Sequence, residues 1–262
     1  MQGRVFIIAG SDSGGGAGIQ ADIKTVTALD GFAATAITAL TAQNTEGVHG
    51  VMPVDIAFIR QQMEVVLRDI GADSIKTGML HCAQVIDTVC SVLRAEAAGI
   101  PLVVDPVMVA KGGASLLDAD AAGTLRQSLL PLATVITPNI PEAEALLGSS
   151  IGSVVDMEEA AQTLRAMGPA AVLVKGGHME GDELIDVLVD EDGVHRFATR
   201  RIQTAHTHGT GCSLASAIAT GLAQGNTLVD AVRRAQAYVA EAIRTAPGFG
   251  RGHGPINHAH TL

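Results

Sequence analysis

Short apolar runs alternate along this chain with longer segments whose apolar residues recur at helical spacing. The clearest helical segment, residues 56–70, reads IAFIRQQMEVVLRDI and gathers its apolar residues on one face. The apolar runs have the length of strands, and glycine or proline ends several of them. The pattern predicts strands at residues 5–9, 33–40, 74–76, 102–105, 134–137 and 171–175, and helices at residues 19–29, 56–70, 83–97 and 228–245.

Two further apolar runs, residues 184–189 and 194–198, are joined through Asp192-Gly193, a strong turn signal that predicts a hairpin. Short apolar strands that alternate with helices indicate an α/β fold with a mainly parallel sheet and helices on both faces. The sequence contains no internal repeat, low-complexity block or linker. We therefore expect a single domain spanning residues 1–262.

Composition narrows the classes of function. The 262 residues are 47% hydrophobic and 17% charged, which suits a compact protein, and the formal net charge is −10. Without a basic cluster, and with no Trp and one Tyr, the chain does not suit nucleic acid or an anionic membrane. No apolar run is long enough for a membrane span or a signal peptide, and three cysteines suit neither a disulfide framework nor zinc. We expect a cytoplasmic protein.

The segment 205–222, AHTHGTGCSLASAIATGL, places Gly209-Thr210-Gly211-Cys212 directly before a helical pattern of small and apolar residues. A helix that starts in this way offers unpaired amides and the positive end of its dipole to an anion. Cys212 falls in the first turn, where the pKa of a thiol tends to fall. An ordinary capped core helix is the alternative for this segment taken alone.

Polar residues follow several of the predicted strands. Asp105, Asn139 and Lys175 stand at or just after the ends of three apolar runs, and the glycine-rich loop 10–18 follows the first. Because ligands bind at the carboxyl ends of strands in such sheets, we expect these positions to converge on one site.

Two common nucleotide motifs are not supported. The sequence contains no Gly-Lys-Ser or Gly-Lys-Thr, so a Walker A loop is absent. Residues 16–21 fit the dinucleotide pattern G-x-G-x-x-A, but the second strand runs into Thr-Ala-Gln-Asn at 41–44 rather than to the acid that would hold a ribose. A kinase accounts for more of the sequence, because phosphoryl transfer requires positioning and charge neutralisation.

The segments AGSDSGGGAGIQADIKT, TALTAQNT, KTGML, DPVM, TPNIPEAEAL, VKGGH, HTHGTGCSLASAIA and GHGPINH occur in this order. Together they resemble the hydroxymethylpyrimidine/phosphomethylpyrimidine kinases of thiamine biosynthesis, over about residues 5–260. That family belongs to the ribokinase-like superfamily, so the resemblance implies a three-layer ribokinase-like fold.

The resemblance also implies roles for residues at the reaction centre. Gly209, Thr210 and Gly211 would form an anion hole, as the matching segment does in the family. Cys212 takes the place of the aspartate base of ribokinases and would lie nearest the substrate hydroxyl, as base or as positioning group.

Four residues match positions near the pyrimidine in the family: Gly10, Asp22, Gln43 and Met79. Gln43 can donate and accept at once, which suits the edge of an aminopyrimidine, and Met79 offers a soft apolar wall. Asp22 lies early in a predicted helix, where simple stabilisation of the helix is the alternative role.

Lys175, directly before Gly176-Gly177, is the cation that we expect at the ATP phosphates, and Asp105 is a candidate to assist magnesium. For Asn139, at ATP, and Glu142, at the metal, the resemblance adds a magnesium–phosphate role through water. The alternative roles are structural: Asn139 and Glu142 fall in N-I-P-E, a sequence that also suits the start of a helix, and Asp105 could cap a loop.

Three remaining features carry expectations of their own. Residues 111–113 (Lys-Gly-Gly) suit a flap that closes over the site, since paired glycines allow hinge motion. His206 and His208 form H-x-H without further zinc ligands, so we interpret them as loop residues. Gln236 stands where members of the family often carry lysine, which could alter nucleotide binding.

The implied activity is the ATP- and magnesium-dependent phosphorylation of 4-amino-5-hydroxymethyl-2-methylpyrimidine, and then of its monophosphate, by a homodimer. A pyridoxal-type kinase on the same fold is the nearest alternative. A pyrimidine-binding regulator without catalysis and an NAD-dependent oxidoreductase are the others.

Overall fold

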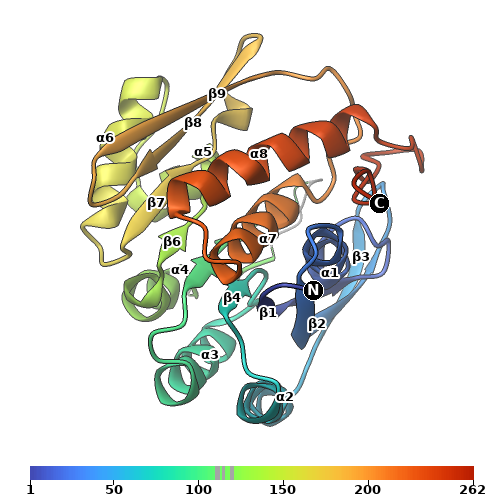
Figure 1. Cartoon of the computed structure of the whole chain (residues 1–262), viewed down its shortest axis with the longest axis vertical. Coiled ribbons are helices and arrows are strands. Elements are labelled where there is room, and N and C mark those ends of the chain that lie inside the picture. Colours follow the sequence, from blue (N-terminus) through green and yellow to red (C-terminus); the bar gives the residue numbers. More distant parts are fainter. Residues whose placement is uncertain (110–112, 114–115, 119–120) are drawn as a thin grey trace.

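The computed structural model describes residues 1–109, 113, 116–118 and 121–262. Within this part of the chain nine strands form one sheet, in the order β3-β2-β1-β4-β5-β6-β7-β8-β9 (Figure 1). The strands are β1 (Arg4–Asp12), β2 (Phe32–Gln43), β3 (Val48–Pro53), β4 (Ser74–Thr77), β5 (Leu102–Val104), β6 (Val135–Ile136), β7 (Ala171–Val174), β8 (Glu183–Val189) and β9 (Val194–Arg200). The six central strands run parallel, and β3, β8 and β9 pair antiparallel at the two edges.

Helices cover both faces of the sheet. One layer contains α1 (Gly18–Ala28), α7 (Thr210–Ala223) and α8 (Leu228–Arg244), and the other contains α2 (Ile56–Asp69), α3 (Ala83–Glu96), α4 (Ala121–Thr124), α5 (Ile140–Leu147) and α6 (Val154–Arg165) (Figure 1). Short helical turns η1 (Leu125–Leu129), η2 (Leu130–Leu132) and η3 (Gly176–His178) complete the described elements. The three-layer α/β fold predicted from the sequence is confirmed. Among the described helices, none is long and apolar enough to cross a membrane.

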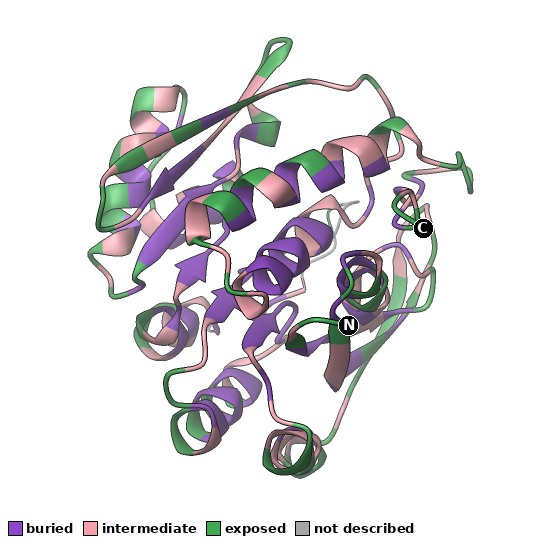
Figure 2. Cartoon of the chain, viewed as in Figure 1, coloured by how far each residue is buried: buried purple, intermediate pink, exposed green. Residues whose placement is uncertain are grey.

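The alternation of side chains along the strands explains the two layers of core. In β1, Val5 and Ile7 pack in the layer that contains α7, whereas Phe6 and Ile8 pack in the layer that contains α3, and all four are buried. Figure 2 shows the central strands buried between the two helix layers. A strand with helices on both faces must be apolar throughout, which is why the central strands read as continuous apolar runs.

Most boundaries of the predicted elements agree with the structure to within a few residues, and the hairpin of β8 and β9 is confirmed. The elements that were missed include β3 and α6. Strand β3 lies at the edge with five of its six residues exposed, so it lacks the alternation that identifies a half-buried strand. Helix α6 does carry a signal: Met157, Ala160, Ala161 and Leu164 are buried at helical spacing after the cap Ser153.

Candidate active site

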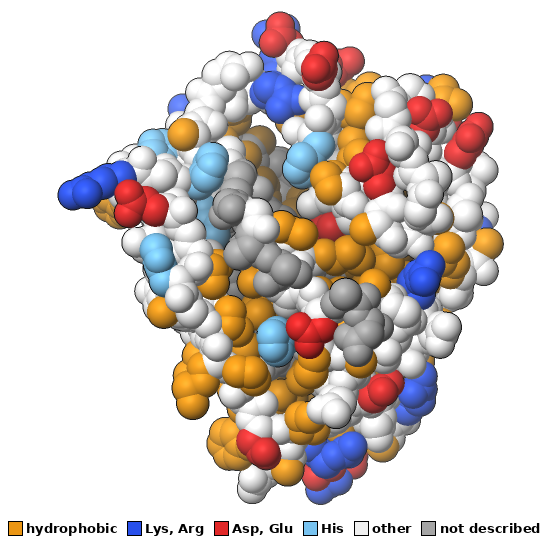
Figure 3. Space-filling view, turned by 180° about the vertical axis from the view of Figure 1, so that it is seen from behind, with side chains coloured by type: hydrophobic (Ala, Val, Ile, Leu, Met, Phe, Trp, Pro, Cys, Tyr) orange, Lys and Arg blue, Asp and Glu red, His pale blue; other side chains and the backbone are white. Residues whose placement is uncertain are grey.

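A cavity of about 440 Å³ opens at the carboxyl ends of the parallel strands. Its wall comes from the end of β1 and the loop after it, the ends of β2, β4, β5 and β7, the start of α5 and the start of α7. Figure 3 shows this side of the molecule, where histidine side chains gather beside a hollow in the surface. The predicted convergence of strand ends on one site agrees with this cavity.

The start of α7 forms one part of the wall. Gly209 precedes the helix with φ of 84°, and a Cβ atom there would overlap the carbonyl oxygen of Gly16. Glycine at 209 therefore lets the segment 209–212 pack directly against the loop after β1. The helical geometry leaves the N–H groups of Gly211 and Cys212 without a carbonyl partner inside α7, and both residues line the cavity. This arrangement suits an anion.

Cys212 differs from the expectation for a thiol at a helix start. Burial raises the pKa of Cys212 to about 12, although the nearby Lys76 acts in the opposite direction. The loss of water around the sulfur outweighs the favourable dipole of α7, so the lowered pKa expected from the helix start is wrong. At neutral pH Cys212 is a thiol, which can donate a hydrogen bond but is not a preformed base.

Lys175 follows β7 directly, and its ammonium group lies between the carboxylates of Asp105 and Glu142. Its Nζ lies 3.0 Å from Oδ1 of Asp105 and 3.9 Å from Oε2 of Glu142. Burial lowers the pKa of Lys175, but attraction to the two carboxylates raises it above its ordinary value, so the side chain stays charged. Thr137 also donates to Asp105, at 3.2 Å. Lys175 thus presents a fixed positive charge to the cavity.

Asn139 and Glu142 form the capping box that their sequence suggested. Oδ1 of Asn139 accepts from the Glu142 amide at 2.9 Å, and Oε2 of Glu142 accepts from the Asn139 amide at 2.8 Å. Burial raises the pKa of Glu142 to about 7, and Lys175 opposes this rise. Both residues line the cavity as well as capping α5, so the structural role does not remove them from the site.

Gly10 and Met79 pack together in the lining of the cavity. A Cβ atom at position 10 would lie 3.0 Å from Sδ of Met79, so glycine there makes room for the thioether. Thr38 donates to the carbonyl of Met79 at 2.7 Å and fixes the loop after β4. Gln43, at the end of β2, also lines this cavity, so these three predicted substrate residues all line one cavity.

Asp22 lies behind the cavity wall rather than in it. The residue is fully buried, and its two carboxylate oxygens each lie 2.9 Å from Nζ of Lys76. Ser216 of α7 donates to the same carboxylate at 2.7 Å. Asp22 therefore orders Lys76, which does line the cavity, instead of facing a substrate directly. Neither helix stabilisation nor a pocket contact describes this role.

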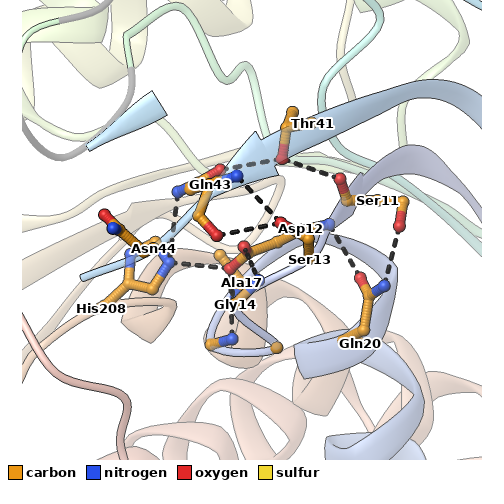
Figure 4. Close-up of polar contacts among 12 residues, drawn as sticks. Ser11, Asp12, Ser13, Gly14, Ala17, Gln20, Thr41, Gln43, Asn44 and His208 are labelled. Atoms are coloured by element: carbon orange, nitrogen blue, oxygen red, sulfur yellow. Dashed lines mark hydrogen bonds and ion pairs between the residues drawn. The ribbon is translucent and has the colours of Figure 1, made fainter. Parts of the chain in front are cut away.

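Two residues close to Gln43 were not identified as site residues from the sequence: Asp12 and His208. His208 lies in the segment between β9 and α7, as the interpretation as a loop residue requires, but it is also buried and lines the cavity, which the sequence did not indicate. Its Nε2 lies 2.9 Å from Oδ2 of Asp12 and 3.4 Å from Nε2 of Gln43 (Figure 4). Both residues stand inside the quoted motifs, but 196 positions separate them, and their contact requires the fold.

The remaining sequence features lie in different places. Lys111 and Gly112 of the expected flap fall outside the described residues. Gln236 donates to Asp186 at 2.6 Å, and Asp186 accepts from the amide of Gly176, next to Lys175. In the part of the chain that the structure describes, no three His, Cys, Asp or Glu side chains are grouped as metal ligands.

Comparisons with known proteins agree with this geometry. A family model described as phosphomethylpyrimidine kinase matches residues 12–257. The thiamine biosynthesis bifunctional protein ThiED of Geobacter sulfurreducens is 52% identical over 98% of this chain, which spans only 52% of that protein. The hydroxymethylpyrimidine/phosphomethylpyrimidine kinase of Bacillus subtilis is 47% identical, covering 97% of this chain and 94% of its own. Among solved structures, Staphylococcus aureus pyridoxal kinase in complex with AMP-PCP and pyridoxal has a TM-score of 0.90 at 35% identity, covering 99% and 94% of the two chains.

Proposed function

The chain belongs to the phosphomethylpyrimidine kinase family, and on this basis we propose that it phosphorylates 4-amino-5-hydroxymethyl-2-methylpyrimidine with ATP and then phosphorylates the monophosphate. The diphosphate that results serves thiamine synthesis. One observation carries the proposal: a single cavity is lined by the first turn of α7, whose amides have no carbonyl partner within that helix, by the cation Lys175 and by the amide side chain of Gln43.

The residues of the cavity divide the work of transfer. The amides of Gly211 and Cys212, with Gly209 and Thr210 shaping the turn, receive the migrating phosphoryl group. Lys175, with Asn139 beside it, neutralises the nucleotide phosphates. The thiol of Cys212 lies beside the acceptor hydroxyl and orients it through a hydrogen bond. A base is not needed at the outset, because in a loose transition state the attacking hydroxyl forms little bond to phosphorus and can keep its proton until late in the transfer.

The donors around Lys175 fit a magnesium ion that arrives with the nucleotide. Magnesium binds through one or two carboxylates together with phosphates and water, rather than in a cage of protein ligands. Asp105 and Glu142 supply two carboxylates at the cavity wall, beside Lys175. The ion would neutralise phosphate charge there. Asp105 and Glu142 would also hold Lys175 in place.

A pyridoxal-type kinase remains the second candidate, because the Staphylococcus aureus pyridoxal kinase shares the fold. Two points favour the pyrimidine. The identity to the Bacillus subtilis pyrimidine kinase is 47%, against 35% to this pyridoxal kinase. Gln43 also offers a donor and an acceptor side by side, which match the ring nitrogen and exocyclic amine of an aminopyrimidine.

A product assay resolved by mass tests the proposal. Hydroxymethylpyrimidine, its monophosphate and pyridoxine are offered together with ATP and magnesium to wild type, Cys212→Ala and the control Cys82→Ala, which changes a cysteine outside the cavity lining. We expect pyrimidine mono- and then diphosphate from wild type and the control, with a strong reduction in Cys212→Ala. Phosphorylation of pyridoxine alone would assign a vitamin B6 kinase instead. Binding of the pyrimidine without any transfer would point to a regulator.

We also propose a homodimer that works in the cytoplasm, where ATP is supplied. The edge strand β3 supports the dimer: Val51 and Met52 are exposed apolar residues on an unpaired strand edge, a surface that proteins usually cover. Sedimentation at several concentrations measures the oligomeric state. A monomer throughout the micromolar range would refute the dimer.

A further inference from the structure

Three polar side chains lie together in the part of the cavity where we propose that the pyrimidine ring binds. They come from the end of β1, the end of β2 and the segment before α7 (Figure 4). They are Asp12, Gln43 and His208, and Asp12 and His208 are both buried. We propose that Asp12 and His208 fix the orientation of the Gln43 amide and thereby select a ring that presents an acceptor nitrogen beside an exocyclic amine. This inference rests on the proposed pyrimidine substrate and names the residues that enforce its choice.

The surroundings of Asp12 define its charge. Backbone N–H groups of Gly14, Gly16 and Ala17 donate to its carboxylate at 2.8, 3.1 and 2.8 Å. Burial raises the pKa of Asp12, but the hydrogen bonds from His208 and the loop amides lower it further, so the residue is ionised at neutral pH. An ionised carboxylate can only accept.

The charge of Asp12 determines the proton on His208. Nε2 of His208 lies 2.9 Å from Oδ2 of Asp12. Two lone pairs at this distance would repel, so Nε2 must carry a hydrogen that it donates to the carboxylate. The same nitrogen lies 3.4 Å from the end of the Gln43 side chain. An NH₂ group of Gln43 at this position would face another donor, so Gln43 turns its carbonyl oxygen toward His208 and shares the single Nε2 hydrogen with Asp12.

Thr41 imposes the same orientation from the other side. Its hydroxyl has one hydrogen, and the carbonyl of Ser11 at 3.0 Å can only accept it. The other end of the Gln43 amide lies 3.2 Å from this hydroxyl oxygen. Once the Thr41 hydrogen points to Ser11, the oxygen can accept only from the NH₂ group of Gln43. If the oxygen and nitrogen of the Gln43 amide are exchanged, the NH₂ group donates to Thr41 and the oxygen accepts from His208.

An amide in a fixed orientation accepts only one order of donor and acceptor groups on the substrate ring. Gln43 retains one N–H and one lone pair of its oxygen for the cavity, in positions set by Thr41 and His208. The 4-aminopyrimidine edge offers an acceptor next to a donor, whereas the 4-oxo analogue offers a donor next to an acceptor. The hydroxymethyl group must point toward the start of α7, so the ring cannot turn over to correct the mismatch. Unpaired polar groups in the cavity then penalise the analogue.

The test compares kcat/KM for the 4-amino substrate and its 4-oxo analogue. We expect wild type to prefer the amine by roughly 100-fold, the cost of two mismatched hydrogen bonds. His208→Phe removes the N–H that holds Gln43, so the preference should fall about 10-fold, through KM for the pyrimidine and not KM for ATP. His208→Gln retains a donor at similar reach and should restore the preference. His195→Phe, on β9 outside the cavity lining, is the matched control.

The outcomes separate this inference from the proposed function. Equal losses on both substrates in His208→Phe would mean a merely structural role and would overturn the inference. If His208→Phe does not fold, Thr41→Val removes the second restraint and should lower the preference in the same way. If wild type transfers no phosphoryl group, the proposed function fails. The ratio of the two dissociation constants, measured by calorimetry without ATP, then decides whether Gln43 is still oriented.

Discussion

The ion pair of Lys76 and Asp22 gives the sharpest prediction of stability. Both side chains are 0% exposed, and both carboxylate oxygens lie 2.9 Å from Nζ. Burial lowers the pKa of Lys76, but Asp22 and its other anionic neighbours raise it, whereas burial raises the pKa of Asp22 against the effect of Lys76. Both net shifts are upward, so the shift of Lys76 favours its charged form whereas the shift of Asp22 favours its neutral form. We regard the pair as ionised because both carboxylate oxygens contact the ammonium group.

Lys76→Met leaves the Asp22 carboxylate buried with only Ser216 to compensate it. Breaking a buried pair from one side costs about 3–5 kcal/mol, because the remaining charge is not solvated. Adding Asp22→Asn removes that charge, so the double variant should lose far less than the sum of the single losses. We expect a coupling free energy of at least about 2 kcal/mol between the two sites. Arg244→Met, which breaks an exposed pair on α8, should leave the unfolding midpoint nearly unchanged.

Urea unfolding followed by far-UV circular dichroism is the assay, since the chain has no Trp and one Tyr. The pH dependence supplies a second readout. In Lys76→Met the folded-state pKa of Asp22 should lie further above its unfolded value of about 3.9, so the folded state binds the extra proton and stability rises as pH falls from neutrality toward that unfolded value. Additive losses below about 1 kcal/mol at both sites, with no such slope, would refute the reasoning.

Three other residues give independent checks. Gly209→Ala should lower the urea midpoint more than Gly225→Ala, because both positions have positive φ but a Cβ at 225 meets no described atom within 4 Å; equal shifts would contradict the close packing on Gly16. Burial lowers the pKa of His258 to about 4, so between about pH 6.5 and 4 the unfolded state binds a proton that the folded state does not. The free energy of unfolding should therefore fall by up to roughly 3 kcal/mol over this range. In urea titrations His258→Gln should remove this pH dependence. Because the pKa of Cys212 is raised to about 12, its alkylation by iodoacetamide should keep accelerating above about pH 9, and a plateau there would show an ordinary thiol.

The sequence predicts the parts of the site that local rules place. Lys175 follows a continuous apolar run, and Gly209 precedes a helical pattern, so the ends of their elements could be located without the fold. The parallel sheet then had to gather those ends at one edge. Asn139 and Glu142 likewise announce their helix start through the sequence N-I-P-E.

The features that the sequence could not supply depend on contacts between distant positions. Lys76 finds Asp22 54 residues away, and only the fold shows that the carboxylate lies behind the cavity and not in it. The pKa of Cys212 is a related case. The local rule for helix starts lowers it, but burial, which belongs to the tertiary structure, raises it. Pairing across the chain and removal of water are therefore what sequence motifs leave undetermined.

The cavity solves an electrostatic problem for a chain with a formal charge of −10. Such a protein repels phosphates at long range, so positive charge must be held locally where the phosphates bind. A buried lysine alone would lose its proton. Here Lys76 is paired with Asp22 and Lys175 with Asp105, and each pair keeps its ammonium group charged at the cavity wall. The acids that make the chain anionic overall are thus the reason that Lys76 and Lys175 can serve an anionic substrate at the cavity wall.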